Sequence, residues 1–333
     1  MEKQESPGVA VWGIGDHAQR NLLPAIAANP ALRLAGITSR NRSICETVAE
    51  TYGSRYWLDF ERMLADDDVD VVVIATPTGL HVEHAGAALK AGKHVWCDKP
   101  LCETYDEAET LVSLARERSR SLCTVFAPPH HAQFKILRDL LATDRVGPLR
   151  RLEAVFEIPH LAPDNFRYKR ALGGGALLDM AIYPLDISVR LMGRVPESYF
   201  CELESEDGFD VDTGGRAVLI FDEDRTAELH WGYGRDYANH LRISGDAGAI
   251  GVERPFSKPP DFEGSITIEH VITGDETIPV AAENQFSAMM TAFAKAITDR
   301  DARAVLYEDA LRQQKLLEQT RDAASHLELK FNS

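Results

Sequence analysis

The sequence predicts an α/β protein of two domains: a doubly wound parallel sheet in residues 1–125, and an α+β domain with a large, mostly antiparallel sheet in residues 126–333. The first reason is length, because 333 residues exceed the size at which one hydrophobic core usually stops growing. The second is a change of texture along the chain. Short apolar runs alternate with helix-like segments in the first part, and strand-like runs with little helix between them follow residue 150.

The first domain is expected to consist of βαβ units. The apolar runs that we expect to be buried strands are Val9–Trp12, Leu32–Thr38, Val69–Ala75, His94–Cys97 and Cys123–Phe126. The amphipathic stretches that we expect to be helices are Ala18–Ala28, His81–Ala91 and Asp106–Arg118. Thr104 and Glu107 form a capping-box pattern at the start of the third helix.

The second domain is expected to be rich in strands. Its strand-like runs are Arg150–Ile158, Arg216–Phe221, Thr226–Tyr233, Leu241–Ser244, Ser265–His270 and Glu276–Val280. Its expected helices are Leu178–Met192, Gln285–Thr298 and Glu308–Ala324. The last of these could pack back on the first domain.

Composition excludes several classes of protein. A net charge of −16 disfavours nucleic acid and anionic membranes as partners. No apolar run approaches the roughly 18–20 residues of a membrane span, and the polar start lacks the apolar core of a signal peptide. We therefore expect a cytoplasmic protein with no membrane partner. The five cysteines are odd in number and irregularly spaced, which argues against a disulfide framework.

A glycine-rich turn follows the first expected strand. It reads Gly13-Ile14-Gly15-Asp16-His17-Ala18. Gly13 permits a tight turn, Gly15 lets the backbone approach a pyrophosphate, and the small Ala18 lets the helix pack close to the strand. The helix N-terminus then offers N–H groups to the phosphates. A plain strand–turn–helix is the alternative, but the position at the start of a βαβ series favours a Rossmann dinucleotide site.

The residues after the second strand indicate which dinucleotide binds. A carboxylate there would bond the ribose 2′-hydroxyl of NAD. This chain instead has Ser39, Arg40 and Arg42, which suit a 2′-phosphate because guanidinium groups form paired, charge-assisted bonds to phosphate oxygens. The alternative is a basic loop that only faces water. We expect a preference for NADP(H), with use of NAD(H) left open.

Two segments carry a family resemblance. They are Ile74-Ala75-Thr76-Pro77-Thr78-Gly79-Leu80-His81 and Ala91-Gly92-Lys93-His94-Val95-Trp96-Cys97-Asp98-Lys99-Pro100-Leu101. The block resembles that of the Gfo/Idh/MocA family of glucose–fructose oxidoreductases and inositol dehydrogenases. The resemblance implies that Ala75, Thr76, Pro77 and His81 line the cofactor pocket. It also implies that Asp98, where the family usually has glutamate, reaches the nicotinamide ribose.

Lys99 is the candidate catalytic lysine. It follows a buried strand and precedes Pro100, and such strand ends are where α/β folds place ligands. Without the resemblance, an ordinary surface lysine would be the simpler interpretation. The resemblance implies that Lys99 and Pro100 lie beside the nicotinamide, with the lysine reaching the reacting oxygen of the substrate.

A second set of candidates follows the triple glycine Gly173-Gly174-Gly175. Asp179, Tyr183 and Asp186 recur at i, i+4 and i+7, so on a regular helix they share one face, which could simply be solvated. By resemblance Asp179 matches a family aspartate, and Tyr183 stands where many members have histidine. This points to the branches of glucose–fructose oxidoreductase, dihydrodiol dehydrogenase and nucleotide-sugar ketoreductases. A phenol of pKa about 10 needs a nearby ammonium such as Lys99 to ionise readily.

Three further groups remain open. Arg167, in the basic segment before the glycines, could meet an anionic substrate or could only be solvated. The family usually has an arginine after the strand that ends near Phe126, and here His130 or His131 could replace that contact. His81 and His84 form an H-x-x-H pair, but no closed tetrahedral set is apparent, so no metal is expected.

The leading functional hypothesis is an NADP(H)-dependent oxidoreductase acting on a sugar or keto-sugar, with or without a nucleotide attached. Lys99 and Tyr183 would exchange the proton, and Asp179 would orient substrate hydroxyls or Lys99. Arg167, Asp179, Tyr183 and Asp186 form the expected substrate site. The alternatives are an aldose or cyclic polyol dehydrogenase and, from another class, a non-catalytic dinucleotide sensor. By resemblance we expect a homodimer or homotetramer.

Overall fold

The computed structural model describes residues 6–329 and divides the chain into two compact units. Unit 1 comprises Met1–Ala127 and Gln285–Gln314, and unit 2 comprises Pro128–Asn284 and Lys315–Ser333. The helix α9 (Arg300–Asp322) therefore contributes residues to both units. The polar start, which supported the expectation of a cytoplasmic protein, lies largely in residues 1–5, outside the described residues.

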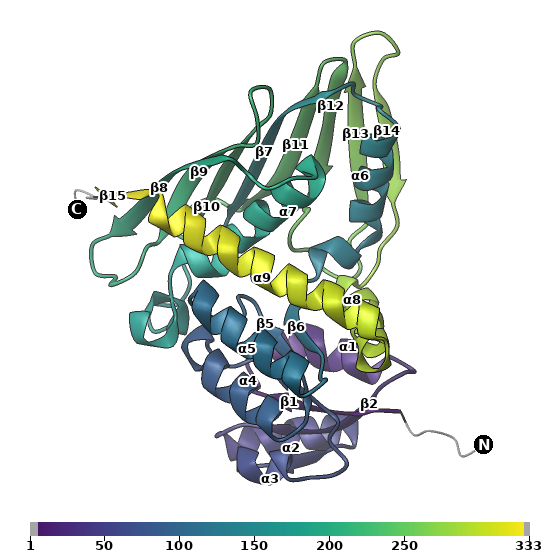
Figure 1. Cartoon of the computed structure of the whole chain (residues 1–333), viewed down its shortest axis with the longest axis vertical. Helices are drawn as coiled ribbons and strands as arrows, with labels where there is room; N and C mark the ends of the chain where they lie inside the picture. The colour runs from purple at the N-terminus through teal and green to yellow at the C-terminus, as the bar shows by residue number, and fades with distance from the viewer. Residues whose placement is uncertain (1–5, 330–333) are drawn as a thin grey trace. The chain divides into compact units, whose positions relative to one another are not determined.

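Unit 1 is built on a parallel sheet whose strand order is β3-β2-β1-β4-β5-β6 (Figure 1). Within the described chain its strands are β1 (Gly8–Trp12), β2 (Arg33–Thr38), β3 (Arg55–Trp57), β4 (Val71–Ile74), β5 (His94–Asp98) and β6 (Leu122–Val125). Strand order reverses between β1 and β4, and open α/β sheets bind ligands at the carboxyl ends of their strands at such a point. The predicted doubly wound sheet is confirmed.

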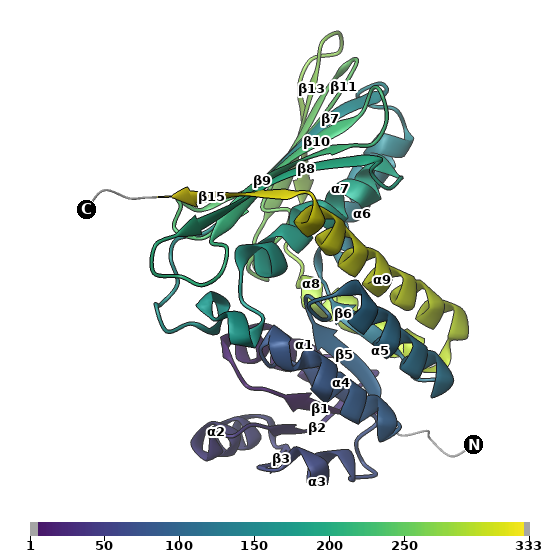
Figure 2. The ribbon, with the colours of Figure 1, turned by 60° about the vertical axis from the view of Figure 1, so that its left-hand side comes forward.

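Helices cover both faces of this sheet. They are α1 (Leu23–Ala27), α2 (Arg42–Tyr52), α3 (Phe60–Leu64), α4 (His81–Lys90), α5 (Tyr105–Glu117), α8 (Gln285–Thr298) and the first part of α9. One core joins Val9 and Val11 of β1 to α1 and to Met289 of α8. The other joins Ala10 of β1 to α4 and α5 and to Tyr307 of α9. Figure 2 shows α4 and α5 side by side over the second core.

Unit 2 is built on a second, mixed sheet in the order β14-β13-β12-β11-β7-β10-β9-β8-β15. Its described strands are β7 (Leu149–Glu157), β8 (Ser198–Glu206), β9 (Gly214–Ile220), β10 (Thr226–Gly232), β11 (Ala238–Gly245), β12 (Gly248–Glu253), β13 (Gly264–His270), β14 (Glu276–Val280) and β15 (Ala324–Leu329). The pairs β7–β10 and β8–β15 are parallel, and the others are antiparallel. The predicted, mostly antiparallel sheet is confirmed.

The helices of unit 2 lie before and after the triple glycine. They are α6 (Ala132–Ala142), a π-helical turn η6 (Leu177–Ala181) and α7 (Ile182–Met192), which packs on β7 and β10. The segment Arg170–Met192 is long and apolar enough to cross a membrane by length and composition alone, although the sequence analysis singled out no such run. Its most apolar window is 78% buried inside the folded chain, as in the core helix of many soluble proteins. The segment therefore does not by itself indicate a membrane protein.

Several elements were absent from the expectation or extend beyond it. The sequence pattern did not single out α2, β3, α3, α6, β8 or β15. The expected helix Glu308–Ala324 begins eight residues earlier, at Arg300, and ends at Asp322. Residues from Ala324 onward leave it to form β15, which pairs with β8. That pairing spans more than a hundred residues of chain, so no local periodicity could reveal it.

Candidate active site

The glycine turn of unit 1 has the shape of a phosphate cradle. Gly13 has φ +97°, and a Cβ on it would lie 2.7 Å from the carbonyl oxygen of Ala75 and 2.9 Å from Cγ2 of Thr76. Only glycine fits this position without strain. A Cβ on Gly15 would meet nothing within 4 Å, so the backbone there is open to a ligand. Ala18 is buried at the start of a π-helical turn, η1 (Ala18–Leu22), that leads into α1.

The loop after β2 presents one arginine more freely than the other. Asn41 caps α2 by accepting a hydrogen bond from the backbone N–H of Ile44, and the Oγ of Ser39 accepts from Asn41 N. Arg42 lies 3.5 Å from the Glu46 carboxylate one turn further along α2. Arg40 is exposed and, within residues 6–329, has no carboxylate at ion-pair distance. Of the two guanidinium groups, that of Arg40 is therefore the better placed for a 2′-phosphate.

Asp98, Lys99 and Pro100 lie at the carboxyl end of β5 and just after it. Asp98 Oδ1 accepts a hydrogen bond from the backbone N–H of Lys99 at 2.8 Å. Asp98 Oδ2 lies 3.8 Å from Nε2 of His17 in the glycine turn, which is too long for a direct hydrogen bond. That His17 nitrogen is buried without a hydrogen-bond partner. The Asp98 carboxylate, which is shorter than that of a glutamate, therefore faces Nε2 of His17 across a gap of 3.8 Å. One hydroxyl group or water molecule could bridge this gap.

His81 supports this loop from within the protein. Its ring nitrogens lie 2.9 Å from the carbonyl oxygen of Pro100 and 2.7 Å from that of Thr76. Carbonyl oxygens only accept, and a neutral ring has one N–H, so the ring lies between the ends of β4 and β5 and donates to one of the two carbonyls. Burial lowers the pKa of His81 below its usual value, which favours the neutral ring. His81 is thus placed to hold the pocket lining in position, since it is almost fully buried.

In unit 2 the triple glycine allows close contact before η6. A Cβ on Gly174 would lie 2.5 Å from the carbonyl oxygen of Arg167. Gly175 has φ +119°, and a Cβ there would come within 2.4 Å of Asp212 Oδ1. The same carboxylate accepts a hydrogen bond from the backbone N–H of Leu177 at 2.6 Å. Burial raises the pKa of Asp212 to about 6. Asp212 therefore fixes the start of the helical segment that carries Asp179 and Tyr183.

Asp179 is held by two donors on one oxygen. Arg167 Nε donates to its Oδ2 at 2.8 Å, and the hydroxyl of Tyr233 donates to the same atom at 2.9 Å. Tyr233 lies directly after β10 and is almost fully buried. Burial, followed by the charge of Asp179, raises the pKa of Tyr233 well above its usual value, so this phenol remains a donor. Arg167, expected to meet substrate, is thus seen here paired with Asp179.

Tyr183 and Asp186 have different surroundings. Tyr183 lies edge-on to Phe156 at 5.1 Å between ring centroids, and Phe256 is 6.2 Å away. Asp186 is fully buried, and its Oδ2 accepts from Nε of Arg190 at 2.6 Å. The expectation of one shared α-helical face does not carry over unchanged, because η6 is π-helical and α7 begins only at Ile182. A wider turn displaces Asp179 relative to the other two residues.

The histidines after β6 have a structural arrangement. His131 Nδ1 accepts from the backbone N–H of Gln133 and caps α6. His130 lies in the short turn before it. Across the part of the chain that the structure describes, no three histidine, cysteine, aspartate or glutamate side chains gather as metal ligands.

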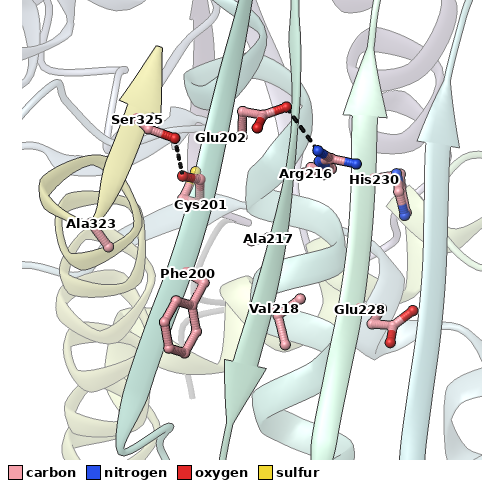
Figure 3. Close-up of a pocket in the computed structure, with 10 residues that line it drawn as sticks. All are labelled: Phe200, Cys201, Glu202, Arg216, Ala217, Val218, Glu228, His230, Ala323 and Ser325. Carbon is pink, nitrogen blue, oxygen red and sulfur yellow. Dashed lines mark hydrogen bonds and ion pairs between the residues drawn. The ribbon is translucent and has the colours of Figure 1, made fainter. Parts of the chain in front are cut away.

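A hollow of about 480 Å³ lies on unit 2, and Figure 3 shows the residues that line it. Its lining includes Phe200, Glu202, Arg216, Val218 and His230. Phe156 contacts Tyr183 of α7, and the strand register then places Arg216, Val218 and Phe200 on the opposite face of the sheet. Arg216 pairs with Glu202 at 3.1 Å, and Phe200 is 60% exposed. This hollow contains no predicted site residue.

Comparisons with known proteins decide the family. Residues 8–126 match the model of an oxidoreductase family with an NAD-binding Rossmann fold, and residues 134–251 match the GFO/IDH/MocA C-terminal domain. The chain belongs to the Gfo/Idh/MocA family. The expectation of an oxidoreductase is thereby confirmed, as is the resemblance that carried it.

Among its relatives, this Gfo/Idh/MocA protein is similar to dTDP-3,4-didehydro-2,6-dideoxy-alpha-D-glucose 3-reductases. It is 33% identical to that of Actinomadura kijaniata over 316 residues, 95% of each chain. It is 33% identical to that of Streptomyces violaceoruber over 330 residues, again 95% of each. The solved structure of KijD10, a 3-ketoreductase from Actinomadura kijaniata in complex with NADP and TDP-benzene, has a TM-score of 0.92 at 32% identity. That match covers 98% of this chain and 100% of KijD10.

A second solved structure represents another activity in the same fold. It is the aldose–aldose oxidoreductase of Caulobacter crescentus complexed with glycerol, with a TM-score of 0.86 at 27% identity. The match covers 96% of this chain and 97% of that one.

Sequence reasoning missed three residues that shape this Gfo/Idh/MocA site: Tyr233, Asp212 and Asn239. Tyr233 and Asp212 act on the segment of Asp179 from other parts of the chain. Asn239 bonds the loop of Phe256 through Phe256 N and Ser257 O, and so holds that ring near Tyr183. A buried aromatic residue at a strand end was the only local signal for Tyr233.

Proposed function

We propose that the protein uses NADP(H) to reduce a keto-sugar, most simply one linked to a nucleotide, or to oxidise the corresponding alcohol. The observation that carries this proposal is full-length similarity to 3-reductases of a dTDP-linked keto-sugar. The relative KijD10 is described as bound to NADP and to a TDP derivative. Arg40, Asp179 and Tyr183 of this chain are the residue types that such chemistry needs.

The residues of unit 1 fit a dinucleotide. The open backbone at Gly15 and the close approach at Gly13 form a cradle for a pyrophosphate. Arg40 and Ser39 would hold the 2′-phosphate, and Asp98 with His17 would hold the nicotinamide ribose. Ala75, Thr76 and Pro77 would line the pocket, supported by His81. The bound cofactor supplies or accepts the hydride.

The proton would pass through Tyr183. In the reductive direction the Tyr183 hydroxyl would donate a proton to the alkoxide that forms on the substrate, and the Lys99 ammonium would stabilise the resulting phenolate. In the opposite direction the phenolate removes the proton. Asp179 would orient a substrate hydroxyl or Lys99, and Arg167 and Tyr233 would keep its carboxylate in one orientation. The pair formed by the buried Asp186 and the partly exposed Arg190 would stabilise the helix that carries Tyr183.

Replacing Arg40 by alanine is expected to raise KM for NADPH roughly tenfold and to change KM for NADH little. A charge-assisted bond to the 2′-phosphate would be lost, which corresponds to about 1.5–3 kcal/mol at most. The measurement is steady-state kinetics with both cofactors. Arg42→Ala is the matched control, and its effect should be smaller because Glu46 already pairs with Arg42. An unchanged ratio of NADPH to NADH preference in Arg40→Ala would refute the assignment.

The substrate class is tested by a panel followed through nicotinamide absorbance at 340 nm in both directions, with dTDP-linked keto-sugars, free keto-sugars, aldoses and cyclic polyols. We expect turnover with NADPH to be fastest on nucleotide-linked keto-sugars. Preferential oxidation of aldoses would favour the second candidate, an aldose dehydrogenase, which the likeness to the Caulobacter enzyme supports. No turnover on any of them, with NADPH still bound, would favour a dinucleotide sensor.

The oligomeric state stays a prediction. In the single chain, Phe200 and Val218 are exposed on the sheet face opposite α7, among paired charges such as Arg216 and Glu202. We propose that this face joins copies of the chain into a dimer or tetramer.

A further inference from the structure

Unit 1 contains a cavity of about 410 Å³ that the proposed function does not use. It lies between the end of α5 and the first turns of α9. Its lining consists of Arg116, Ser119, Arg300, Arg303, Ala304 and Tyr307. Its volume falls in the range of small-molecule sites, roughly 300–1,000 Å³.

This cavity is far from the glycine turn in the topology of the sheet. Helix α5 starts after the carboxyl end of β5 and ends at Glu117, shortly before β6 begins at Leu122. The cavity therefore lies toward the amino ends of the strands. The glycine turn follows the carboxyl end of β1, so it lies at the opposite end of the strands of the same parallel sheet. A ligand in this cavity would not overlap with a dinucleotide on the glycine turn.

Charge is the most informative property of the cavity. The chain has 52 acidic and 36 basic residues, and most of its arginines lie beside a carboxylate. In the described range 6–329, however, Arg116, Arg300 and Arg303 have no carboxylate at ion-pair distance. Three unneutralised guanidinium groups around one hollow are unusual in a protein of net charge −16. They indicate a site that is completed by an anion.

Two of these guanidinium groups are fixed in place by neutral contacts. Arg303 donates to the carbonyl oxygen of Ser119 at 2.6 Å, and Arg116 stacks over the Tyr307 ring at 5.5 Å from its centroid. Tyr307 is in turn held by a hydrogen bond from its hydroxyl to the carbonyl oxygen of Arg120. These contacts leave further N–H groups on both arginines for a ligand.

Two carboxylates close to the cavity in the sequence, those of Asp299 and Glu117, are engaged elsewhere. Asp299 caps α9 by accepting from the backbone N–H groups of Asp301 and Ala302, and it lies 3.4 Å from Lys295. Glu117 lies 3.6 Å from Arg118. The positive potential also reaches a buried group: burial and then the charges of Arg120 and Arg303 lower the pKa of His94 to about 4.

We propose that this cavity binds a small molecule bearing a phosphate or pyrophosphate group. Phosphate oxygens accept the paired donors of a guanidinium, and the hydroxyl of Ser119 adds another donor. The N-terminal end of the 23-residue helix α9 contributes partial positive charge to the same anion. The site is separate from the dinucleotide site, so both can be occupied at once.

Isothermal titration of the full chain with inorganic pyrophosphate, without and with saturating NADPH at constant ionic strength, tests this proposal. We expect saturable binding of one pyrophosphate per chain that persists when NADPH is present. The variant Arg116→Gln/Arg300→Gln should weaken it by at least about tenfold, because two charge-assisted contacts are lost. Arg138→Gln removes one positive charge from an exposed position on α6, as Arg300→Gln alone does in the cavity, and should leave binding unchanged. Orthophosphate is titrated in parallel, and saturable binding of either anion supports the site.

Three results would overturn the proposal: heats that do not saturate, equal affinity in the double variant and wild type, or complete loss of pyrophosphate binding once NADPH is present. The last would place pyrophosphate on the glycine turn instead. Because Arg116 packs on Tyr307, thermal unfolding of the double variant is measured first. If that variant is unfolded, the exposed Arg300→Gln alone takes its place, and an unchanged affinity in it would equally reject the site.

Discussion

Replacing Tyr183 by phenylalanine should lower kcat by about 10²–10⁴-fold and leave NADPH affinity nearly unchanged. The substitution removes one hydroxyl and keeps the ring, so the packing on Phe156 and Phe256 is retained. Without the hydroxyl, the forming alkoxide has no positioned donor. The measurements are turnover on the best substrate of the panel and NADPH titration by fluorescence.

The control is Tyr199→Phe, which deletes a phenolic hydroxyl in the same unit. That hydroxyl bonds Gln319 at 2.9 Å and has no role in the proposed site. Turnover of this variant should stay near the wild-type value. If Tyr183→Phe also keeps its activity, Tyr183 is not the proton donor and the proposed chemistry fails at this step.

Replacing Tyr233 by phenylalanine should lower kcat by about 10–100-fold, although Tyr233 is assigned no contact with substrate. Its hydroxyl is a buried donor to Asp179 Oδ2, and its loss leaves that carboxylate with Arg167 on the same oxygen. We expect Asp179 to become less precisely oriented, so kcat should fall more than KM changes.

A double-mutant cycle with Asp179→Asn separates this positioning role from a general loss of stability. If Tyr233 acts through Asp179, the double variant should lose clearly less activity than the product of the two single losses. Multiplicative losses would mean that Tyr233 supports only the fold. If Asp179→Asn itself has no effect on turnover, then the role of Asp179 in the proposed function is wrong, which is a different outcome.

Local sequence patterns predicted the parts of this protein that depend on local structure. β1, β4 and β5 are short apolar runs between amphipathic helices, so their place in a parallel sheet could be expected. Gly13 and Gly15 could be assigned to a dinucleotide-binding turn because that turn requires glycine at these two positions, independently of the rest of the chain. The edge strand β3 is only three residues long, so it gave no clear period, whereas α2 is amphipathic and was overlooked.

The site in unit 2 could be predicted only in part, because its contacts join distant segments. Tyr233 lies 54 residues from Asp179, and Asp212 lies 35 residues from Leu177. Nothing in the spacing of either pair indicates that they meet. Arg167 was noticed as a cation and expected to meet an anionic substrate, yet its guanidinium lies against Asp179. Only the folded structure shows which carboxylate pairs with the guanidinium of Arg167.

The division of α9 between the two units has a practical consequence for anyone who wishes to study them apart. Met289 and Phe293 of α8, and Tyr307 of α9, are buried in the cores on the two faces of the first sheet. A fragment ending near Ala127 would lack all three and would expose part of the core on each face of that sheet to water. The segments of the two units alternate along the chain. No single truncation therefore yields a complete dinucleotide-binding domain.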